Sequence, residues 1–381
     1  MFRFRSIPII WLFLSFTGTL VAQDSLMFKG QLSAWALYNG GLDLPVYMGG
    51  RYIPQLNYEI MLQNDKLIDF EASANINGNF GFHPFDTLNA DGKIAPYRIW
   101  GRYSSRQFEV RAGLQKINFG SANLLRPLMW FDEVDPRDPL NLTDGVWGVL
   151  ARYYFLNNAN IWLWGLYGDD KTKGWEVFPS KKNSIEYGGR VQVPLYTGEV
   201  AASYHHRTAD ANGVLPDSII QGFTYPENRF SVDAKIDLGV GLWVEAALIH
   251  QDLNFTELKY RSLLNAGMDY TFNLGNGLNM MTEVFGYLQG DQPLGSHEKT
   301  AFGLLSATYP INIIHNISAM VFYDFTNKDI YRFINWGIAY DKWSFYVMTY
   351  WNPENYNLYN LDYQTTLYSG WGIQLMAVFN H

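Results

Sequence analysis

The stretch IDFEASANI, from Ile68 to Ile76, alternates strictly between apolar and polar residues. A β-strand places successive side chains on opposite faces, so all the apolar side chains here would share one face. The same period of two recurs in FSVDAKI (230–236) and FEVRA (108–112). It recurs less strictly in IEYGGRV (185–191) and WGIQLMAVF (371–379). These stretches therefore predict strands with one apolar and one polar face.

The composition agrees with strands that cross a membrane. Aromatic residues make up 17% of the chain and charged residues 17%, and there are 26 tyrosines. Ordinary soluble domains carry about 25% charged residues. No long apolar run follows the N-terminal region, so the apolar residues must be spread by alternation. This combination is typical of a transmembrane β-barrel.

Turn signals divide the chain into alternating short and long connections. Short turns are predicted at 64–66, 104–107, 157–160, 196–199, 237–241, 274–277, 309–312 and 340–342. Longer loops are predicted at about 39–50, 77–96, 117–144, 168–183, 208–228, 251–260, 289–300, 325–329 and 352–370. Short turns at one end and longer loops at the other are the layout of outer-membrane barrels. The pattern predicts an all-β, antiparallel, up-and-down barrel of about 18 strands, with 16 as the alternative and both termini on the periplasmic side.

A soluble β-sandwich or propeller would need different strands. Soluble strands average about five or six residues, whereas these runs are nearer 9–12, the length that crosses a bilayer at a tilt. No repeat of about 40–50 residues indicates propeller blades. The chain also ends near an aromatic residue, Phe379, as outer-membrane barrels usually do, with Asn380 and His381 following it.

The first residues predict export. Arg3 and Arg5 precede an apolar core from Pro8 to Leu14, and Ala22 occupies a small-residue cleavage position. The apolar core is shorter than the roughly 20 residues of a spanning helix, which argues against a membrane anchor. We therefore expect a signal peptide at 1–22 and the barrel at 23–381.

Charge and cysteine content limit the possible partners and cross-links. The formal net charge is −8 at pH 7, and removal of the two signal arginines makes it about −10. An acidic chain is a poor candidate for binding nucleic acid. The chain has no cysteine, so disulfides and thiolate metal sites are excluded.

A cluster of arginines is expected on the inner face of the barrel. If the apolar phase faces lipid, the other phase lines the lumen, because a charge in hydrocarbon is costly. Most such charges would simply pair across neighbouring strands. However, the predicted fourth to eighth strands concentrate guanidinium groups, which attract carboxylate or phosphate. The predicted pore-lining and selectivity residues are Arg98, Arg102, Arg111, Arg152 and Arg190.

The loop 117–144 is the candidate constriction. A barrel of 18 strands encloses a lumen that is too wide to discriminate solutes by size, and long loops without secondary structure are usually functional. Prolines would stiffen the loop, aromatic residues would anchor it, and its acids could neutralise the arginine wall. An ordinary surface loop is the alternative. The predicted constriction residues are Arg126, Trp130, Asp132, Glu133, Asp135, Arg137 and Asp138.

The sequence gives little evidence for a metal site or for an enzyme. The spacing of Asp132, Asp135 and Asp138 lacks the Asp-x-Asp-x-Asp-Gly form of a calcium loop. Neighbouring His205 and His206 would point to opposite faces of one strand. No hydrolase, zinc or phosphate-loop motif is present, so we expect no enzyme, cofactor or metal. Inward aromatic residues could instead stack on sugar rings, although interface girdles explain most aromatics in barrels; they are Trp35, Trp100, Tyr346 and Tyr350.

The chain resembles Gram-negative outer-membrane porins in architecture. More locally, VRAGLQKINFGSANLLRP followed by DPRDPLNLTDG is similar to the strand and loop of alginate-export-type channels. The matching residues are Arg111, Gly113, Gln115 and Gly120. The resemblance implies a solute channel and does not name the solute. The placement of the arginines leads us to predict passive diffusion of small polar or anionic solutes, with acidic sugars as one candidate class.

A capsule-anchoring lectin barrel is the main rival interpretation. Its lumen would be plugged, and exposed aromatics such as Tyr356, Tyr359 and Tyr363 would bind polysaccharide. The expected partners of the channel are the lipid bilayer, lipopolysaccharide, the barrel-assembly machinery and the solute. The sequence is compatible with a monomer and with a homo-oligomer.

Overall fold

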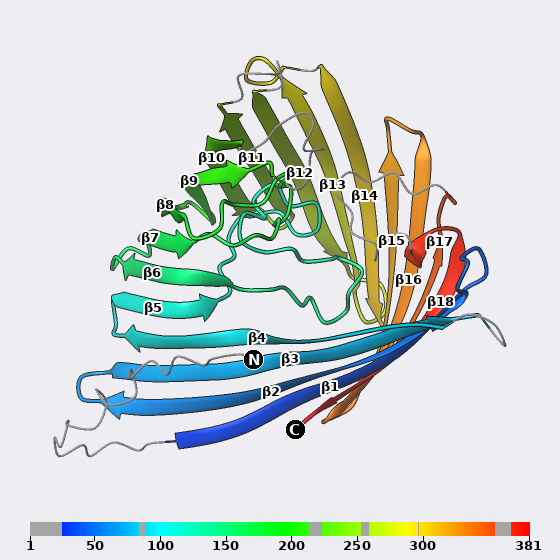
Figure 1. Cartoon of the computed structure of the whole chain (residues 1–381). Coiled ribbons are helices and arrows are strands. Elements are labelled where there is room, and N and C mark those ends of the chain that lie inside the picture. The colour runs from blue at the N-terminus through cyan, green and yellow to red at the C-terminus, as the bar shows by residue number, and fades with distance from the viewer. Residues whose placement is uncertain (1–24, 84–87, 213–222, 253–258, 296, 355–366) are drawn as a thin grey trace, which may run out of the picture.

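The chain folds as one closed antiparallel barrel (Figure 1). The computed structural model describes residues 25–83, 88–212, 223–252, 259–295, 297–354 and 367–381, so the predicted signal peptide lies outside the described residues. Within the described residues there are eighteen strands, which confirms the prediction of 18 rather than 16. No helix of that part is long and apolar enough to span a bilayer. The strands are β1 (Ser25–Asn39), β2 (Val46–Leu62), β3 (Lys66–Phe82), β4 (Leu88–Ser104), β5 (Phe108–Gln115), β6 (Val146–Tyr154), β7 (Asn160–Tyr167), β8 (Ile185–Leu195), β9 (Gly198–Asp210), β10 (Thr224–Asp237), β11 (Gly241–Gln251), β12 (Tyr260–Phe272), β13 (Leu278–Gly290), β14 (Glu298–Pro310), β15 (His315–Asp324), β16 (Asp329–Ala339), β17 (Trp343–Trp351) and β18 (Trp371–Asn380).

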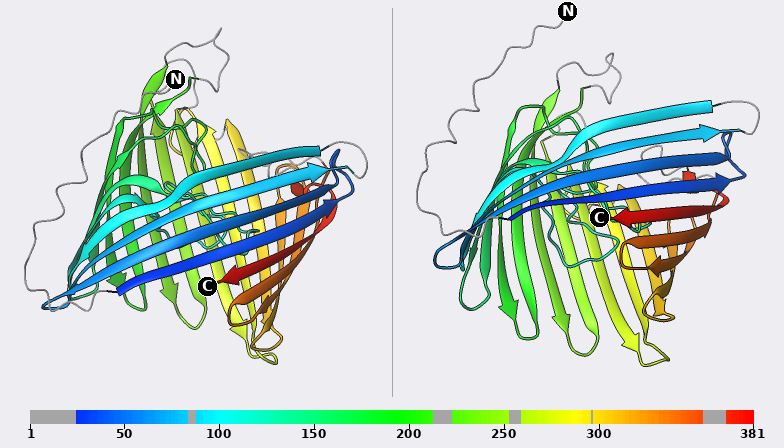
Figure 2. Two further views of the ribbon diagram at one scale, coloured as in Figure 1. Left: turned by 60° about the horizontal axis from the view of Figure 1, so that its bottom comes forward. Right: turned by 90° about the horizontal axis from the view of Figure 1, so that it is seen from below.

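The barrel closes because the first strand pairs with the last. Each strand pairs with its neighbours in the sequence, and β1 pairs with both β2 and β18. In the closing register Leu32 lies opposite Phe379, and Figure 2 shows β18 beside β1. Closure leaves no strand edge with unpaired backbone groups, which a bilayer would not tolerate.

Strand β10 shows why the alternating sequence forms this wall. Phe230 and Val232 are 50% and 58% exposed on the outer face, whereas Ser231 and Asp233 are buried on the inner face. The same division holds around the barrel, where the exposed large side chains of the strands are mostly apolar and the buried charges point inward. Such an outer face suits the hydrocarbon of a bilayer.

The strands on one side are longer than the sequence predicted. The expected loop at 77–96 is wrong, because β3 continues to Phe82 and β4 begins at Leu88, with Gly78 paired to Gly92. Asparagine and glycine there resemble a loop, but their backbone groups pair across the hairpin. The expected loops at 39–50 and 208–228 are likewise shortened by pairing.

Candidate functional site

Two glycines of the motif quoted above lie where β5 ends and where the segment that joins it to β6, residues 116–145, turns into the barrel. Gly113 and Gly120 have φ angles of +124° and +108°, which only glycine adopts readily. A Cβ atom on Gly120 would lie 2.5 Å from Oε2 of Glu245 on β11. This glycine therefore lets the backbone approach a carboxylate of the wall. We refer to residues 116–145 as the β5–β6 segment.

Glu245 holds the first part of the β5–β6 segment. Its carboxylate accepts hydrogen bonds from the backbone N–H groups of Ser121 (2.8 Å), Ala122 (2.9 Å) and Leu128 (2.7 Å). The hydroxyl of Ser121 also donates to Asp233 on β10 at 3.0 Å. Hydrogen bonds to a buried carboxylate are charge-assisted, and each contributes roughly 1.5–3 kcal/mol.

Glu283 on β13 holds the next residues in the same way. It accepts the backbone N–H groups of Asn123 (2.8 Å), Leu124 (3.2 Å) and Leu125 (2.6 Å), and the indole N–H of Trp243 at 3.2 Å. The side chain is fully buried. Two wall carboxylates therefore hold consecutive amides of the β5–β6 segment, and every one of these amides belongs to the backbone.

Aromatic packing fixes the segment against β7 and β9. Phe119 stacks on Trp164 with ring centroids 5.6 Å apart, and Phe131 meets the ring of His205 edge-on at 4.9 Å. Trp130 is also buried, 6.0 Å from the same imidazole. Trp130, a predicted constriction residue, and its neighbour Phe131 are thus in the apolar cluster of the barrel interior.

The acid next to this aromatic cluster, Asp132, pairs with residues of the same segment. Arg126 Nη1 donates to Asp132 Oδ2 at 2.8 Å, and Asn118 donates to the same oxygen at 3.1 Å. Arg126 also donates to the backbone oxygen of Phe119 at 3.2 Å. These contacts join residues 118–126 of the segment to Asp132.

The later part of the segment has its own ion pair and turn. Arg137 binds Asp135 through two nitrogens, at 2.8 and 2.7 Å, and stacks over the ring of Tyr368 at 4.7 Å. Asp138 accepts the backbone N–H of Leu140 at 2.9 Å. Burial raises the pKa of Asp138 above its ordinary value despite this hydrogen bond.

Three of the predicted selectivity arginines form a cluster near the short turns. Arg102 donates to both oxygens of Asp69 at 2.9 and 2.8 Å. Glu109 lies 3.7 Å from Arg102, 3.3 Å from Arg111 and 3.5 Å from Arg152. Three guanidinium groups thus share two carboxylates, and all three remain partly exposed.

The other two predicted arginines are buried and have structural contacts. Arg98 Nη2 donates to the backbone oxygen of Thr143 at 2.8 Å, so it ties the end of the β5–β6 segment to β4. Arg190 binds both oxygens of Asp233 at 2.6 and 2.8 Å and lies under Phe119. Among the described residues, no ion pair joins a wall arginine to Asp132, Asp135 or Asp138. The expectation that the loop acids neutralise the arginine wall is therefore wrong.

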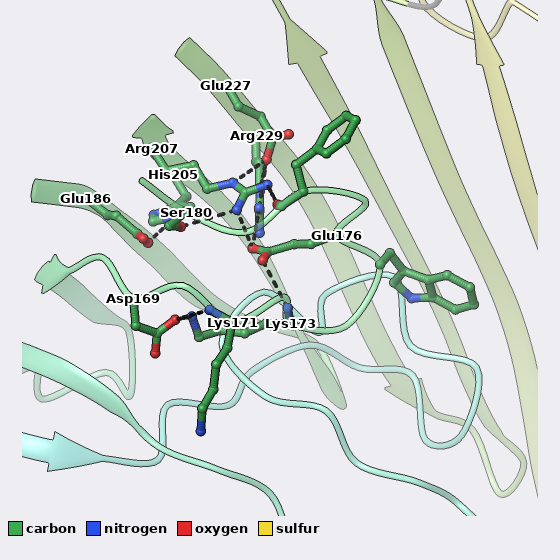
Figure 3. Close-up of polar contacts among 12 residues, drawn as sticks. Asp169, Lys171, Lys173, Glu176, Ser180, Glu186, His205, Arg207, Glu227 and Arg229 are labelled. Carbon is green, nitrogen blue, oxygen red and sulfur yellow. Dashed lines mark hydrogen bonds and ion pairs between the residues drawn. The ribbon is translucent and has the colours of Figure 1, made fainter. Parts of the chain in front are cut away.

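A second inward segment, residues 168–184 between β7 and β8, is held by a buried ionic cluster (Figure 3). Glu176 of this β7–β8 segment contacts Arg207 at 3.1 Å and Arg229 at 2.6 Å. Glu227 on β10 contacts Arg207 (2.7 Å), Arg229 (2.7 Å) and Arg261 (2.9 Å). All five side chains are nearly inaccessible to solvent. Because each charge has several partners, the cluster can persist inside the barrel.

The two segments also contact each other. The indole of Trp175 donates to the backbone oxygen of Arg126 at 2.8 Å and stacks on Phe285 of β13 at 4.6 Å. Lys171 pairs with Asp144 at 2.7 Å. The β5–β6 and β7–β8 segments therefore form one body against the wall from β7 to β14.

A cavity of about 560 Å³ remains between this body and the rest of the wall. One side is formed by both segments and includes Asp132, Glu133, Asp135, Arg137 and Asp138, five of the predicted constriction residues. The five predicted selectivity arginines do not line this cavity. The opposite side is largely aromatic, and its lining includes Trp35, Tyr47, Tyr97, Phe322, Tyr331, Phe333 and Tyr368.

Sequence reasoning missed most of the residues that hold the two segments. Glu227 fell in the expected loop 208–228, and Arg207 and Arg261 were not singled out. Glu245 and Glu283 lie in the polar phase of their strands, but nothing in their local sequence indicates that they bind backbone amides 117 to 160 residues away. The only sequence signal for these two residues is that each is an acid in the polar phase of its strand, β11 or β13.

The sequence also suggested alternative sites, namely inward aromatic residues for sugar stacking, a metal site and tyrosines for polysaccharide binding. Of the four inward aromatic residues, Trp35 lines the cavity, whereas Trp100 lies beneath Arg111 at 4.7 Å. Within the described residues, no group of three His, Cys, Asp or Glu side chains could hold a metal ion. Tyr356, Tyr359 and Tyr363 lie outside the described residues.

Comparison with known proteins gives structural similarity alone. No protein-family model and no curated protein matches the chain. Solved structures do match: Pseudomonas aeruginosa OpdQ has a TM-score of 0.55 at 10% identity, with 94% of this chain and 98% of that chain covered. P. aeruginosa OccD3 (OpdP) has a TM-score of 0.57 at 10% identity, covering 96% and 92%. Acinetobacter baumannii OccAB4 has a TM-score of 0.57 at 9% identity, covering 94% and 99%. The chain therefore has the fold of an outer-membrane porin.

Proposed function

We propose that the protein is an outer-membrane channel through which small polar or anionic solutes diffuse, narrowed by the β5–β6 and β7–β8 segments. The cavity of about 560 Å³ beside the two segments is the observation that carries the proposal. Barrels of 16 to 18 strands that function as porins keep an aqueous passage. Here the passage would run along the wall formed by β1–β4 and β14–β18.

The preference for anions rests on the arginine cluster. Among the described residues, Arg102, Arg111 and Arg152 pair with Asp69 and Glu109, and their side chains are 16–26% exposed. In a confined space, partly exposed guanidinium groups that gather in this way attract carboxylate or phosphate. Acidic sugars would combine this charge with rings suited to the aromatic wall.

The test is single-channel conductance of the refolded protein in a planar bilayer, with the reversal potential measured under a salt gradient. We expect discrete steps with anion preference. The triple change R102Q/R111Q/R152Q should move the reversal potential toward cation preference. The control R106Q removes a guanidinium that is paired with Asp65 in a short turn, where its side chain is 80% exposed, and it should leave the potential unchanged.

Silence from folded, inserted protein would overturn the channel and favour a plugged barrel that binds polysaccharide at the cell surface. Insertion in the outer membrane further implies contact with lipopolysaccharide and passage through the barrel-assembly machinery. Cross-linking in intact membranes would test for a homo-oligomer.

A further inference from the structure

The cavity contains one cation that differs from the others. Arg137 pairs with Asp135, Lys171 with Asp144 and Lys173 with Asp169. Arg51 of β2 also lines the cavity. Among the described residues, no hydrogen bond or ion pair reaches its guanidinium, and its Nε atom is buried without a partner.

A half-buried guanidinium that has no partner in the described part of the chain is unusual. Burying a cation without a counter-charge costs free energy, and buried polar groups normally have hydrogen-bond partners. Asp138 lines the same cavity, and the positive charge of Arg51 acts to lower its pKa. Yet the carboxylate of Asp138 accepts its hydrogen bonds from the backbone of Leu140 and Leu142, so the donors of Arg51 stay available to a ligand.

Aromatic side chains surround this cation. The guanidinium of Arg51 lies over the ring of Trp35 at 5.6 Å, an arrangement that presents its planar fork beside an aromatic face. On the same aromatic side of the cavity, Phe333 packs edge-on against Tyr368 with ring centroids 6.3 Å apart. A volume of about 560 Å³ falls within the range of small-molecule sites, about 300–1,000 Å³.

We propose that this cavity is a binding site for a compact organic anion with a planar ring, and that Arg51 is the residue that selects its anionic group. The guanidinium binds the carboxylate, Trp35 covers one face of the ring, and the other aromatic side chains that line the cavity exclude water around it. The proposal rests on the channel function for the passage of the ligand, whereas binding itself does not require conduction. The arginine cluster near the short turns would then attract anions in general, and Arg51 would discriminate among them.

The experiment combines equilibrium binding with conduction. Benzoate binding to the folded protein is measured by titration calorimetry, and the permeability of benzoate relative to chloride is measured from bi-ionic reversal potentials. We expect R51Q to weaken benzoate binding by about tenfold or more, as the loss of a charge-assisted hydrogen bond implies. Its relative benzoate permeability should fall as well. R51K keeps the charge without the planar fork and should restore part of both.

Two comparisons keep the interpretation specific. The control R106Q removes the same charge outside the cavity and should leave both readouts unchanged. W35L should weaken the binding of benzoate but leave the relative permeability of acetate, which has no ring, unaltered. If R51Q binds benzoate as the wild type does, the inference is overturned even though the channel conducts. If the wild type does not conduct but binds benzoate in an Arg51-dependent manner, the channel function fails and the binding site stands.

Discussion

At the scale of single residues, the main feature is a carboxylate surrounded by backbone amides. Glu283 receives the N–H groups of three consecutive residues from a segment that is distant in the sequence. An ionised carboxylate has only acceptor atoms, so it can take all of these donors together. A glutamine would have one oxygen and one donor group at the same place.

Changing Glu283 to glutamine should therefore release the amides of Asn123, Leu124 and Leu125. The amide group would face N–H donors, and the charge that strengthens each hydrogen bond would be lost. We expect faster hydrogen exchange at these three amides and larger fluctuations of the open-channel current. The control E199Q changes an exposed glutamate of β9 and should alter neither. Unchanged exchange in E283Q would show that aromatic packing alone holds the segment.

Gly120 gives a second prediction at this scale. Its positive φ and the nearby Glu245 leave no room for a methyl group, so G120A should displace the segment from the Glu245 carboxylate. A non-glycine residue with this φ costs on the order of 1–3 kcal/mol. We expect faster hydrogen exchange at Ser121 and Ala122, measured against a G277A control, in which a short turn carries similar backbone strain. Equal exchange in both variants would contradict a specific role for Gly120.

At the scale of elements, the strands were predictable and their partners inside the barrel were not. Alternation along Ile68–Ile76 fixes which face of β3 is apolar, because period two is a local property of the chain. The contacts of Glu245 and Arg207 join residues that are far apart in the sequence, and no local pattern encodes them. The prediction that 117–144 narrows the lumen remains a prediction, whereas the segment's contacts with β10, β11 and β13 are structural observations.

The β7–β8 segment should depend on Arg207. R207Q leaves the buried Glu176 and Glu227 with less compensating charge, and breaking a buried ion pair typically costs about 3–5 kcal/mol. We expect the barrel to lose its folded mobility in detergent gels at a lower temperature. The control K182Q breaks an exposed pair with Asp170, in which both side chains are about two-thirds exposed. If both variants melt at the wild-type temperature, the cluster does not stabilise the fold.

The ion pair between the two segments gives a pH dependence of known sign. Burial favours neutral Asp144, but the hydrogen bond from Lys171 and the positive charges of Lys171, Lys93 and Arg98 together outweigh it and lower the pKa of Asp144. The hydrogen bond to Asp144 in turn raises the pKa of Lys171. The pair therefore stabilises the contact above the ordinary Asp pKa of 3.8. This contribution is lost as the pH falls through the lowered value. At the basic end it persists to the ordinary Lys pKa of 10.5 and is lost above it.

Both side chains of this pair are at least half exposed, so the contribution is small, at most about 1 kcal/mol. We expect the effect of this pair on hydrogen exchange in residues 171–175 to be constant between about pH 5 and 9, after correction for intrinsic rates. Once the pH has fallen below the lowered pKa of Asp144, the D144N variant should match the wild type. A difference between the two that persists below that pH would assign the contact to another group.

At the scale of the whole molecule, the strand pairing that closes the barrel is separate from the contacts that hold the segments inside it. The wall closes through strand pairing alone, since Gln115 pairs with Val146 across the base of the β5–β6 segment and β1 pairs with β18. Composition, alternation and turn spacing were sufficient to predict this wall from the sequence. The size of the opening depends on contacts between residues that are far apart in the sequence, and for that reason it could not be predicted.

This separation predicts that the segment can be removed without loss of the barrel. Replacing residues 121–142 by a short Gly-Ser linker removes the amides held by Glu245 and Glu283 but no strand pairing. We expect a folded barrel with a several-fold larger single-channel conductance. The same linker in place of residues 291–295, which do not line the cavity, should leave the conductance near the wild-type value. An unchanged conductance in the first variant would mean that the β5–β6 segment does not limit the passage, and the β7–β8 segment would then be the element to remove next.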